Sequence, residues 1–301
     1  MTKELDAKLK TALDESRLLI LGAQVLFGFA FQGVFQELFR DVSPASRWLQ
    51  GAALALLCAS VVLLIAPSMY HRVACRGQSR HRAIHVAGTL TGWSLLPLTL
   101  GLGASAFVVF DVMAGREFGI AVGAALTATG LALLFGLGMA LRKQAKPFPP
   151  ESETPLKPRI EQLLTEARVI IPGGQALLGF QFVATLTKSF HDLPGWVQAV
   201  HAAGLIAVAL SVLLLMTPAA LHRLAYHGED DPEFFRIGSG LVIAAALPLA
   251  LGIAADIAVV FHAVSKDAAV AILSGVAAFL ALMTAWYVFP LAHRGASHGN
   301  A

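Results

Sequence analysis

The chain has 301 residues, of which 56% are hydrophobic and 14% are charged, and its net charge is +3. Soluble domains carry about 25% charged residues, so the charged fraction of this chain is low. Together with a mean hydropathy of +0.69, it excludes an ordinary water-soluble fold. Nucleic-acid binding has no support, because the basic residues flank apolar segments. Cys58 lies in an apolar run and Cys75 in a basic loop, so no structural disulfide is expected. The composition predicts an integral membrane protein.

The segment before the first apolar run is predicted to stay on the chain. Residues 1–17 mix lysines with acidic residues, and no small-residue cleavage pattern follows. Leu5, Leu9 and Leu13 are spaced four residues apart. We therefore expect a helix before the first span, either a simple juxtamembrane anchor or an amphipathic helix that lies on the membrane surface.

Eight apolar segments are long enough to cross a membrane. A helix needs about 20 apolar residues to span a hydrocarbon core of about 30 Å. The runs lie at about 18–39, 48–70, 84–113, 119–141, 169–190, 197–220, 237–264 and 269–291. They do not alternate as the strands of a membrane barrel do. The predicted fold class is all-α, a polytopic membrane helix bundle with eight transmembrane helices.

The basic residues predict the orientation of these spans. If the N-terminus is cytoplasmic, 17 of the 22 lysines and arginines fall in cytoplasmic segments. The others are Arg40, Arg47, Arg116, Lys188 and Lys266. Because cytoplasmic loops are enriched in lysine and arginine, we expect a protein integral to the cytoplasmic (inner) membrane, with both termini cytoplasmic.

The chain repeats itself at an offset of 151 residues. Nine of the seventeen residues in segment 13–29 (LDESRLLILGAQVLFGF) are identical to those in segment 164–180 (LTEARVIIPGGQALLGF). The same offset aligns more distant residues, such as Pro67 with Pro218, and it holds without a gap over about 100 residues. Self-similarity at one spacing indicates a tandem duplication.

We therefore predict two four-helix repeats, residues 1–142 and 159–301, joined by a proline-rich cytoplasmic linker over residues 143–158. Such a linker is semi-rigid. Each repeat has an even number of spans, so both enter the membrane from the same side. This predicts parallel repeats related by an axis along the membrane normal.

One motif recurs in both repeats: Glu-x-Arg, then Gly-x-Gln and Gly-Phe, and about forty residues later Pro-(x)3-His-Arg. In the first copy its residues are Glu15, Arg17, Gly22, Gln24, Gly28, Phe29, Pro67, His71 and Arg72. The pattern resembles a bacterial four-span integral membrane domain family that is classed as a domain of unknown function. The resemblance covers nearly the whole chain, twice, and implies a fold and a membrane location but no activity. The family is associated with single units, so the resemblance implies that such relatives pair as dimers, which fusion replaces here.

Glutamate, arginine and histidine residues are predicted to gather at the cytoplasmic interface. A Glu-x-Arg pair precedes the first span of each repeat, and a His-Arg pair follows the second. The eight residues are Glu15, Arg17, His71, Arg72, Glu166, Arg168, His222 and Arg223. If the first two helices of a repeat are neighbours, the four groups of that repeat meet at one depth. They would form either a salt-bridged structural clasp or a pocket for an anionic headgroup, a phosphate or a proton.

Gln24 and Gln175 lie about two turns into the first span of each repeat. Because an amide in hydrocarbon is costly without a partner, each glutamine is expected either to bind another helix or to line a polar path. Gln24 shares one helix face with Arg17 and Phe31.

The third span of each repeat is interrupted by a proline and a glycine. The pairs are Pro97 with Gly101 and Pro248 with Gly252. Interruptions at corresponding positions either mark the midplane site of a transporter or kink a tilted helix. The glycine is expected to add freedom at the kink.

Three polar residues lie toward the outer end of the third spans. Asp111 and His262 occupy equivalent positions, and Asp256 lies about two turns deeper than His262. They form either a polar outer mouth or a set of ordinary interfacial residues, and none reaches the centre of the bilayer.

The sequence offers no motif for a cofactor, a metal or a common catalytic reaction. It has no Walker A loop, HExxH, CxxC or GxSxG. His71 and His222 lie at helix ends, which does not favour a bound haem. No acidic or basic residue lies near the middle of a span, although ion-coupled carriers usually bury one.

The leading functional hypothesis is therefore passive or facilitated passage of a small solute between the two repeats, with membrane lipid around them. The alternative is a non-transporting membrane protein that binds lipid headgroups or a partner through its Glu/Arg/His clusters. An enzyme that acts on a lipid headgroup, with His71 or His222 as the acid–base group, comes third.

Overall fold

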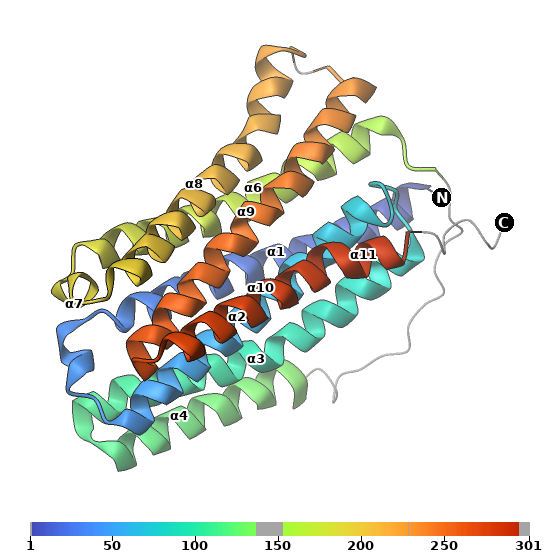
Figure 1. Ribbon diagram of the computed structural model, residues 1–301. Helices are drawn as coiled ribbons and strands as arrows, with labels where there is room; N and C mark the ends of the chain where they lie inside the picture. The colour runs from blue at the N-terminus through green and yellow to red at the C-terminus, as the bar shows by residue number, and fades with distance from the viewer. Residues whose placement is uncertain (1, 137–152, 228, 295–301) are drawn as a thin grey trace.

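The computed structural model describes residues 2–136, 153–227 and 229–294. Within these ranges every regular element is a helix (Figure 1). The first half contains α1 (Thr2–Gly33), η1 (Glu37–Arg40), α2 (Pro44–Val73), α3 (His81–Ala114), α4 (Arg116–Leu131) and a π-helical turn, η2 (Ala132–Gly136). The second half contains α6 (Leu156–Thr185), α7 (Lys188–His191), α8 (Gly195–Leu224), α9 (Pro232–Ser265), α10 (Ala268–Met283), the π-helical turn η3 (Thr284–Val288) and α11 (Phe289–Ala292).

Eight of these helical segments are long and apolar enough to cross a membrane. This confirms the all-α fold class and the number of long apolar helices. Residues 137–141 of the fourth predicted span and residues 143–152 of the predicted linker lie outside the described ranges.

Local sequence signals set where several helices begin. Ser43 accepts a hydrogen bond from the backbone N–H of Ser46 at the start of α2, and a proline follows it. Asp231 and Asp267 cap the N-termini of α9 and α10 in the same way. Such caps satisfy N–H groups that have no partner within the helix.

The connections of the bundle lie at two opposite ends (Figure 1). One end holds the start of α1, the α2–α3 turn, the start of α6, the α8–α9 turn and α11. We call it the basic end, because it carries Arg72, Arg76, Arg80 and Arg82. The other end, called the opposite end, holds the α1–α2, α3–α4, α6–α8 and α9–α10 connections.

Hydrogen bonds tie the α2–α3 turn to the start of the second half. The backbone N–H of Ser79 donates to Thr154 Oγ1 (2.9 Å), and the backbone N–H of Thr154 donates to Gln78 Oε1 (2.7 Å). Arg159 donates to the carbonyl of Arg76 (2.8 Å). The turn after α2 and the start of α6 therefore share one end of the bundle, as the predicted topology requires.

The two halves repeat one packing pattern. In each half the second helix packs against the third, the third against the fourth, and the first against both the second and the third. A Cβ atom added at Gly101 would lie 2.9 Å from Leu57 Cγ, and one added at Gly252 would lie 2.3 Å from Val208 Cγ2. The two glycines thus let the second and third helices approach closely, which gives them a packing role.

The two halves do not pack symmetrically against each other. The equivalent helices α1 and α6 are in contact, and α2 also packs against α9 and η3. The symmetry-related pair, α8 and α3, makes no comparable contact within the described ranges. Helix α4 instead covers the outer side of α3 (Figure 1).

One indole side chain connects the last long helix to the first half. Trp286, in η3, is fully buried and donates from Nε1 to the carbonyl of Val62 on α2 (3.0 Å). Its neighbour Tyr287 donates to the carbonyl of Ile243 on α9 (2.6 Å). The two adjacent aromatic side chains of the π-helical turn therefore bind to two different helices of the core, α2 and α9.

The N-terminal segment is continuous with the first long helix, which excludes the alternative of a separate surface helix. Helix α1 runs without a break from Thr2 to Gly33, and Leu5, Leu9 and Leu13 are buried. Leu9 and Leu13 pack against Ala83 and Ala87 on α3. The apolar stripe is thus covered by protein.

The contact between α1 and α6 leads to the first testable prediction. A Cβ atom at Gly28 would lie 2.1 Å from Phe180 Cδ2, whereas one at the equivalent Gly179 would meet open space. Gly28→Leu is expected to lower the free energy of unfolding by about 1–3 kcal/mol, because overpacking forces neighbouring groups to move. Gly179→Leu should not lower it. Thermal unfolding in detergent measures both, and equal shifts would contradict the α1–α6 packing.

Candidate functional site

A buried ion pair joins the two repeats near the basic end. Glu166 on α6 accepts hydrogen bonds from Arg72 Nε (2.8 Å) and Arg72 Nη2 on α2, and its Oε1 lies 2.9 Å from His71 Nδ1. The exposed fractions are 0% for His71, 3% for Arg72 and 1% for Glu166. We call these three residues the inter-repeat clasp, because α2 belongs to the first repeat and α6 to the second.

The clasp differs from the predicted cluster in its choice of partner. The four groups of one repeat were expected to meet, but Glu166 binds the His-Arg pair of the other repeat. His222 packs against Phe234, with ring centroids 4.7 Å apart, and its Nε2 has no hydrogen-bond partner in the described part of the chain. Arg223 is exposed. The side chain of Glu15 lies outside the described part.

The remaining arginines of the predicted cluster lie apart from the clasp. Arg17 is buried and forms an ion pair with Asp14, while its Nε and Nη2 have no hydrogen-bond partner among the described residues. Arg168 is exposed. The seven members of the predicted cluster whose side chains are described therefore do not form two equivalent sites.

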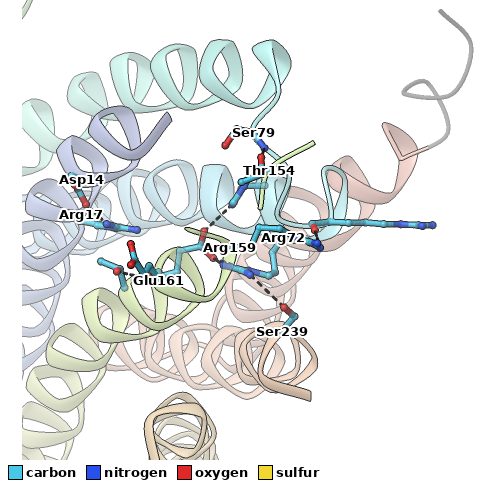
Figure 2. Close-up of polar contacts among 12 residues, drawn as sticks. Asp14, Arg17, Arg72, Ser79, Thr154, Arg159, Glu161 and Ser239 are labelled. Atoms are coloured by element: carbon cyan, nitrogen blue, oxygen red, sulfur yellow. Dashed lines mark hydrogen bonds and ion pairs between the residues drawn. The ribbon is translucent and has the colours of Figure 1, made fainter. Parts of the chain in front are cut away.

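Further contacts surround the clasp on the side of α9. Figure 2 shows Arg72 reaching Ser239, with Nη1 donating to Ser239 Oγ over 3.4 Å. Phe235, one turn earlier on α9, lies 4.2 Å from the guanidinium of Arg159 and 5.8 Å from that of Arg72. Cation–π contacts of this kind help to hold the two guanidinium groups in place. Three helices thus meet at the clasp: α2, α6 and α9.

The two predicted glutamines have different surroundings. Gln24 is buried between α1 and α6, where a Cβ atom at Gly173 would lie 1.4 Å from Gln24 Oε1. Its amide has no hydrogen-bond partner in the described ranges. Gln175 is exposed. Gln24 therefore contacts another helix, but its amide makes no hydrogen bond to the described residues. Gln175, in contrast, is on the surface of the bundle.

The prolines of the third spans also have different surroundings. Pro97 is partly exposed, whereas Pro248 is buried. Near Pro248, Ser211 donates to the carbonyl of Ala245 (2.8 Å) and Tyr287 to that of Ile243. A proline frees a carbonyl in its helix, and neighbouring side chains here bind the carbonyls around it. This is the pattern of a proline accommodated by packing.

A second buried polar cluster lies toward the opposite end of the bundle, within the second repeat. Gln181 Nε2 on α6 donates to Asp256 Oδ1 (3.0 Å) and Oδ2 (2.9 Å) on α9. His201 on α8 binds the carbonyl of Gln181 through Nε2 (3.1 Å), and its Nδ1 lies 3.8 Å from Asp256 Oδ1. All three side chains have an exposed fraction of 0%. We call these residues the acid–histidine cluster.

Sequence reasoning identified Asp256 but missed its two partners. Asp256 was expected at a mouth or at the membrane interface, yet it is fully buried inside the second repeat. Asp111 accepts a hydrogen bond from Ser46 (2.6 Å), and His262 packs edge-on against Trp196. The three residues therefore form no common mouth.

The first repeat has different residues at the positions of the acid–histidine cluster. At the offset of 151 residues, Ala30 corresponds to Gln181, Gln50 to His201 and Ser105 to Asp256. One hydrogen bond is kept, since Gln50 Nε2 donates to the carbonyl of Ala30 (3.0 Å), as His201 does to that of Gln181.

In the first repeat, the residues equivalent to the acid–histidine cluster line a cavity. It measures about 380 Å³, and Ala30, Gln50 and Ser105 are among its lining residues. Most of the lining is apolar, with Leu57, Leu102 and neighbouring side chains of α1, α2 and α3. The cavity reaches neither Gln24, Gln175 nor the two prolines.

Another cavity, of about 290 Å³, lies between the repeats at the opposite end. The first repeat contributes Val34, Phe35, Phe39 and Arg47, and the second contributes Ser189, Asp192, Leu193, Ala263 and Lys266. It is the more polar of the two cavities, since two basic residues, one acidic residue and a serine line it.

Within its described residues the protein is all-α, with eight long apolar helices, two buried acid–histidine contacts and a partly polar cavity between its halves. A family described as "Family of unknown function (DUF6328)" matches residues 1–138 and again residues 152–290. The chain belongs to this family, and the two matches are consistent with a tandem duplication. No curated protein and no solved structure matches the chain.

Proposed function

We propose that the chain is an integral membrane protein that moves a small polar solute along the boundary between its two repeats, with both termini in the cytoplasm. Many large apolar side chains on the bundle surface support a lipid environment, including Leu213 (63% exposed), Leu273 (68%) and Leu280 (57%). Apolar patches of this extent are rare on soluble monomers. The basic end would face the cytoplasm, following the positive-inside rule.

The observation that carries this proposal is a contrast between the two ends of the inter-repeat boundary. At the opposite end both repeats line an open polar cavity. At the basic end the clasp joins the repeats through buried charges. Transporters built from repeats alternate by moving one repeat against the other around a fixed site. Under this proposal the opposite end would be the open side of the molecule, and the clasp would act as a closed gate.

Between these two ends, the described residues leave little space at the boundary. Apolar residues of both repeats, such as Ile65, Met69, Leu215 and Leu249, surround a void of only about 10 Å³. Ser239, which contacts the clasp, and Asp256 are 17 residues apart on α9, or about 25 Å along a helix axis. This separation is comparable to a hydrocarbon core of about 30 Å. Passage would therefore require the repeats to move and the clasp to open.

The lining of the inter-repeat cavity favours a small anionic or zwitterionic solute. Arg47 comes from the first repeat and Lys266 from the second, so a solute bound in the cavity would contact both halves. Asp192 adds an acidic residue to the lining, so residues of both charge signs are present there. Contacts to both repeats would let a bound solute influence their relative position.

The competing hypotheses have less support from this geometry. Both carboxylate oxygens of Glu166 are bonded within the protein, so the clasp offers no free acceptor to a headgroup. His71 is fully buried and could not act as an acid–base group on a lipid headgroup in this conformation. The observed contacts favour a structural clasp over a binding pocket.

Flux into liposomes tests the proposal. The purified protein is expected to admit at least one small charged solute, from a panel of radiolabelled anions, zwitterions, cations and neutral compounds, faster than empty vesicles do. Arg47→Gln should raise the half-saturating concentration about tenfold or more, because a hydrogen bond to a charged group contributes about 1.5–3 kcal/mol. Arg116→Gln, which removes a cation at the same end but outside the cavity, is the control. No flux of any class would exclude passage, and equal effects of the two variants would exclude this route.

A further inference from the structure

In the acid–histidine cluster, two atoms that can both accept a hydrogen bond face each other: His201 Nδ1 and Asp256 Oδ1. A carbonyl oxygen only accepts hydrogen bonds, so His201 Nε2 must carry the hydrogen in its contact with the carbonyl of Gln181. In the neutral imidazole, Nδ1 is then the atom with the lone pair. It faces Asp256 Oδ1 over 3.8 Å and has no hydrogen-bond partner in the described part of the chain.

We propose that Asp256 and His201 bind one exchangeable proton, held between Oδ1 of the carboxylate and Nδ1 of the imidazole. The proton would make either a neutral carboxylic acid that donates to His201 or an imidazolium that forms an ion pair with Asp256. Each arrangement removes the isolated negative charge from the protein interior, where such a charge is costly. A small closing movement would bring the two atoms into hydrogen-bond distance.

The first repeat acts as an internal control for this inference. Its equivalent positions hold Ala30, Gln50 and Ser105, and the same three helices pack together there without a carboxylate. The fold therefore does not require an aspartate at this place. Asp256 and His201 are the ionisable members of the cluster, and both occur only in the second repeat. A buried acidic residue that packing does not require marks a functional position.

The groups around Asp256 leave its charge uncompensated by any permanent cation. Gln181 faces it from α6 and His201 from α8, and the thiol of Cys58 on α2 is close enough to interact with its charge. His201 also stacks on Phe31 of α1, with ring centroids 5.7 Å apart. Within the described residues, His201 is the ion-pair partner of Asp256.

A short aromatic path connects this cluster to the inter-repeat cavity. Phe35 lines the cavity and packs against Phe190, with ring centroids 6.1 Å apart. Phe190 packs against His201 at 4.8 Å. Rotation of these two rings would connect His201 with the polar cavity. Proton binding does not depend on the proposed passage, whereas a coupling of this proton to solute movement would rest on it.

Infrared difference spectroscopy of the purified full-length protein tests proton binding directly. Acidification is expected to produce a carboxylic acid band or an imidazolium band from this pair. Asp256→Ser, which introduces the residue of the first repeat, should abolish that band, and His201→Gln should move the midpoint of its titration by one pH unit or more, a tenfold change in proton affinity. Asp111→Ser is the control and should leave the band in place. Superimposable titrations of Asp256→Ser and the unaltered chain would overturn the proposal.

Stability measurements and flux keep the two proposals separate. A thermal midpoint for Asp256→Ser at or above that of the unaltered chain shows that a missing band does not come from misfolding. If the variant is unstable instead, Gln181→Ala supplies the test, because removing the donor amide should shift the midpoint of the same band, and an unmoved midpoint would overturn the assignment. A protein that binds the proton but shows no solute flux would refute the proposed passage and leave the proton site standing.

Discussion

Glu166→Gln is expected to lower the free energy of unfolding by about 3–5 kcal/mol, the cost of removing one partner of a buried ion pair. The guanidinium of Arg72 would remain buried between α2 and α6 without a negative charge beside it. Thermal unfolding in detergent, followed by circular dichroism, measures the loss.

The repeats provide a matched control for the clasp. Arg223 occupies the position of Arg72 in the second repeat but is exposed, so Arg223→Gln should change stability by no more than about 0.5 kcal/mol. Arg72→Gln, in contrast, should be about as damaging as Glu166→Gln. If Arg72→Gln and Arg223→Gln shift the midpoint equally, the clasp does not join the repeats.

Trp286→Ala is expected to lower the free energy of unfolding by about 3–5 kcal/mol, since it removes a large buried ring. The change would also leave the carbonyl of Val62 on α2 without its indole donor. Trp286→Phe keeps most of the ring and loses the hydrogen bond, so its cost should be nearer to 1 kcal/mol.

Phe135 gives the corresponding comparison in the first repeat. It lies in η2 at the position equivalent to Trp286 but is only half-buried. Phe135→Ala should therefore cost clearly less than Trp286→Ala. Chemical unfolding of the purified variants provides the measurement, and a larger loss for Phe135→Ala would contradict the asymmetric packing of the fourth helices.

The number and approximate position of the long helices could be predicted because long apolar runs are a simple signal in the sequence. A span must be apolar for about 20 residues, and eight runs meet this condition. Correspondence between the repeats also predicted which connections share an end. The side of the membrane that each end faces stays a prediction.

The choice of partners across the repeats could not be predicted, because an offset in sequence gives no information on how two copies pack. Glu166 was expected near His222 and Arg223, on neighbouring helices of its own repeat. The contacts of α2 with α9 and η3 instead bring the first His-Arg pair beside α6. The packing of the two repeats therefore determines that Glu166 binds His71 and Arg72 and does not bind His222 and Arg223.

The acid–histidine cluster was missed for a different reason. The predicted site residues come mainly from motifs that both repeats share. Gln181 and His201 belong to no such motif, because the first repeat has Ala30 and Gln50 at the equivalent positions. A comparison that asks where the repeats differ in polarity would have drawn attention to both positions. Their proximity to Asp256 still required the packing of α6, α8 and α9.

The one-sided clasp has a consequence for how such a molecule can evolve. In a homodimer of identical four-helix subunits with two-fold symmetry, every mutation acts twice, so an ion pair on one side would be copied to the other. Fusion into one polypeptide releases each half from that constraint. Arg223 can then be exposed while Arg72 is paired with Glu166. One half can likewise contain an acidic residue, Asp256, where the other has Ser105.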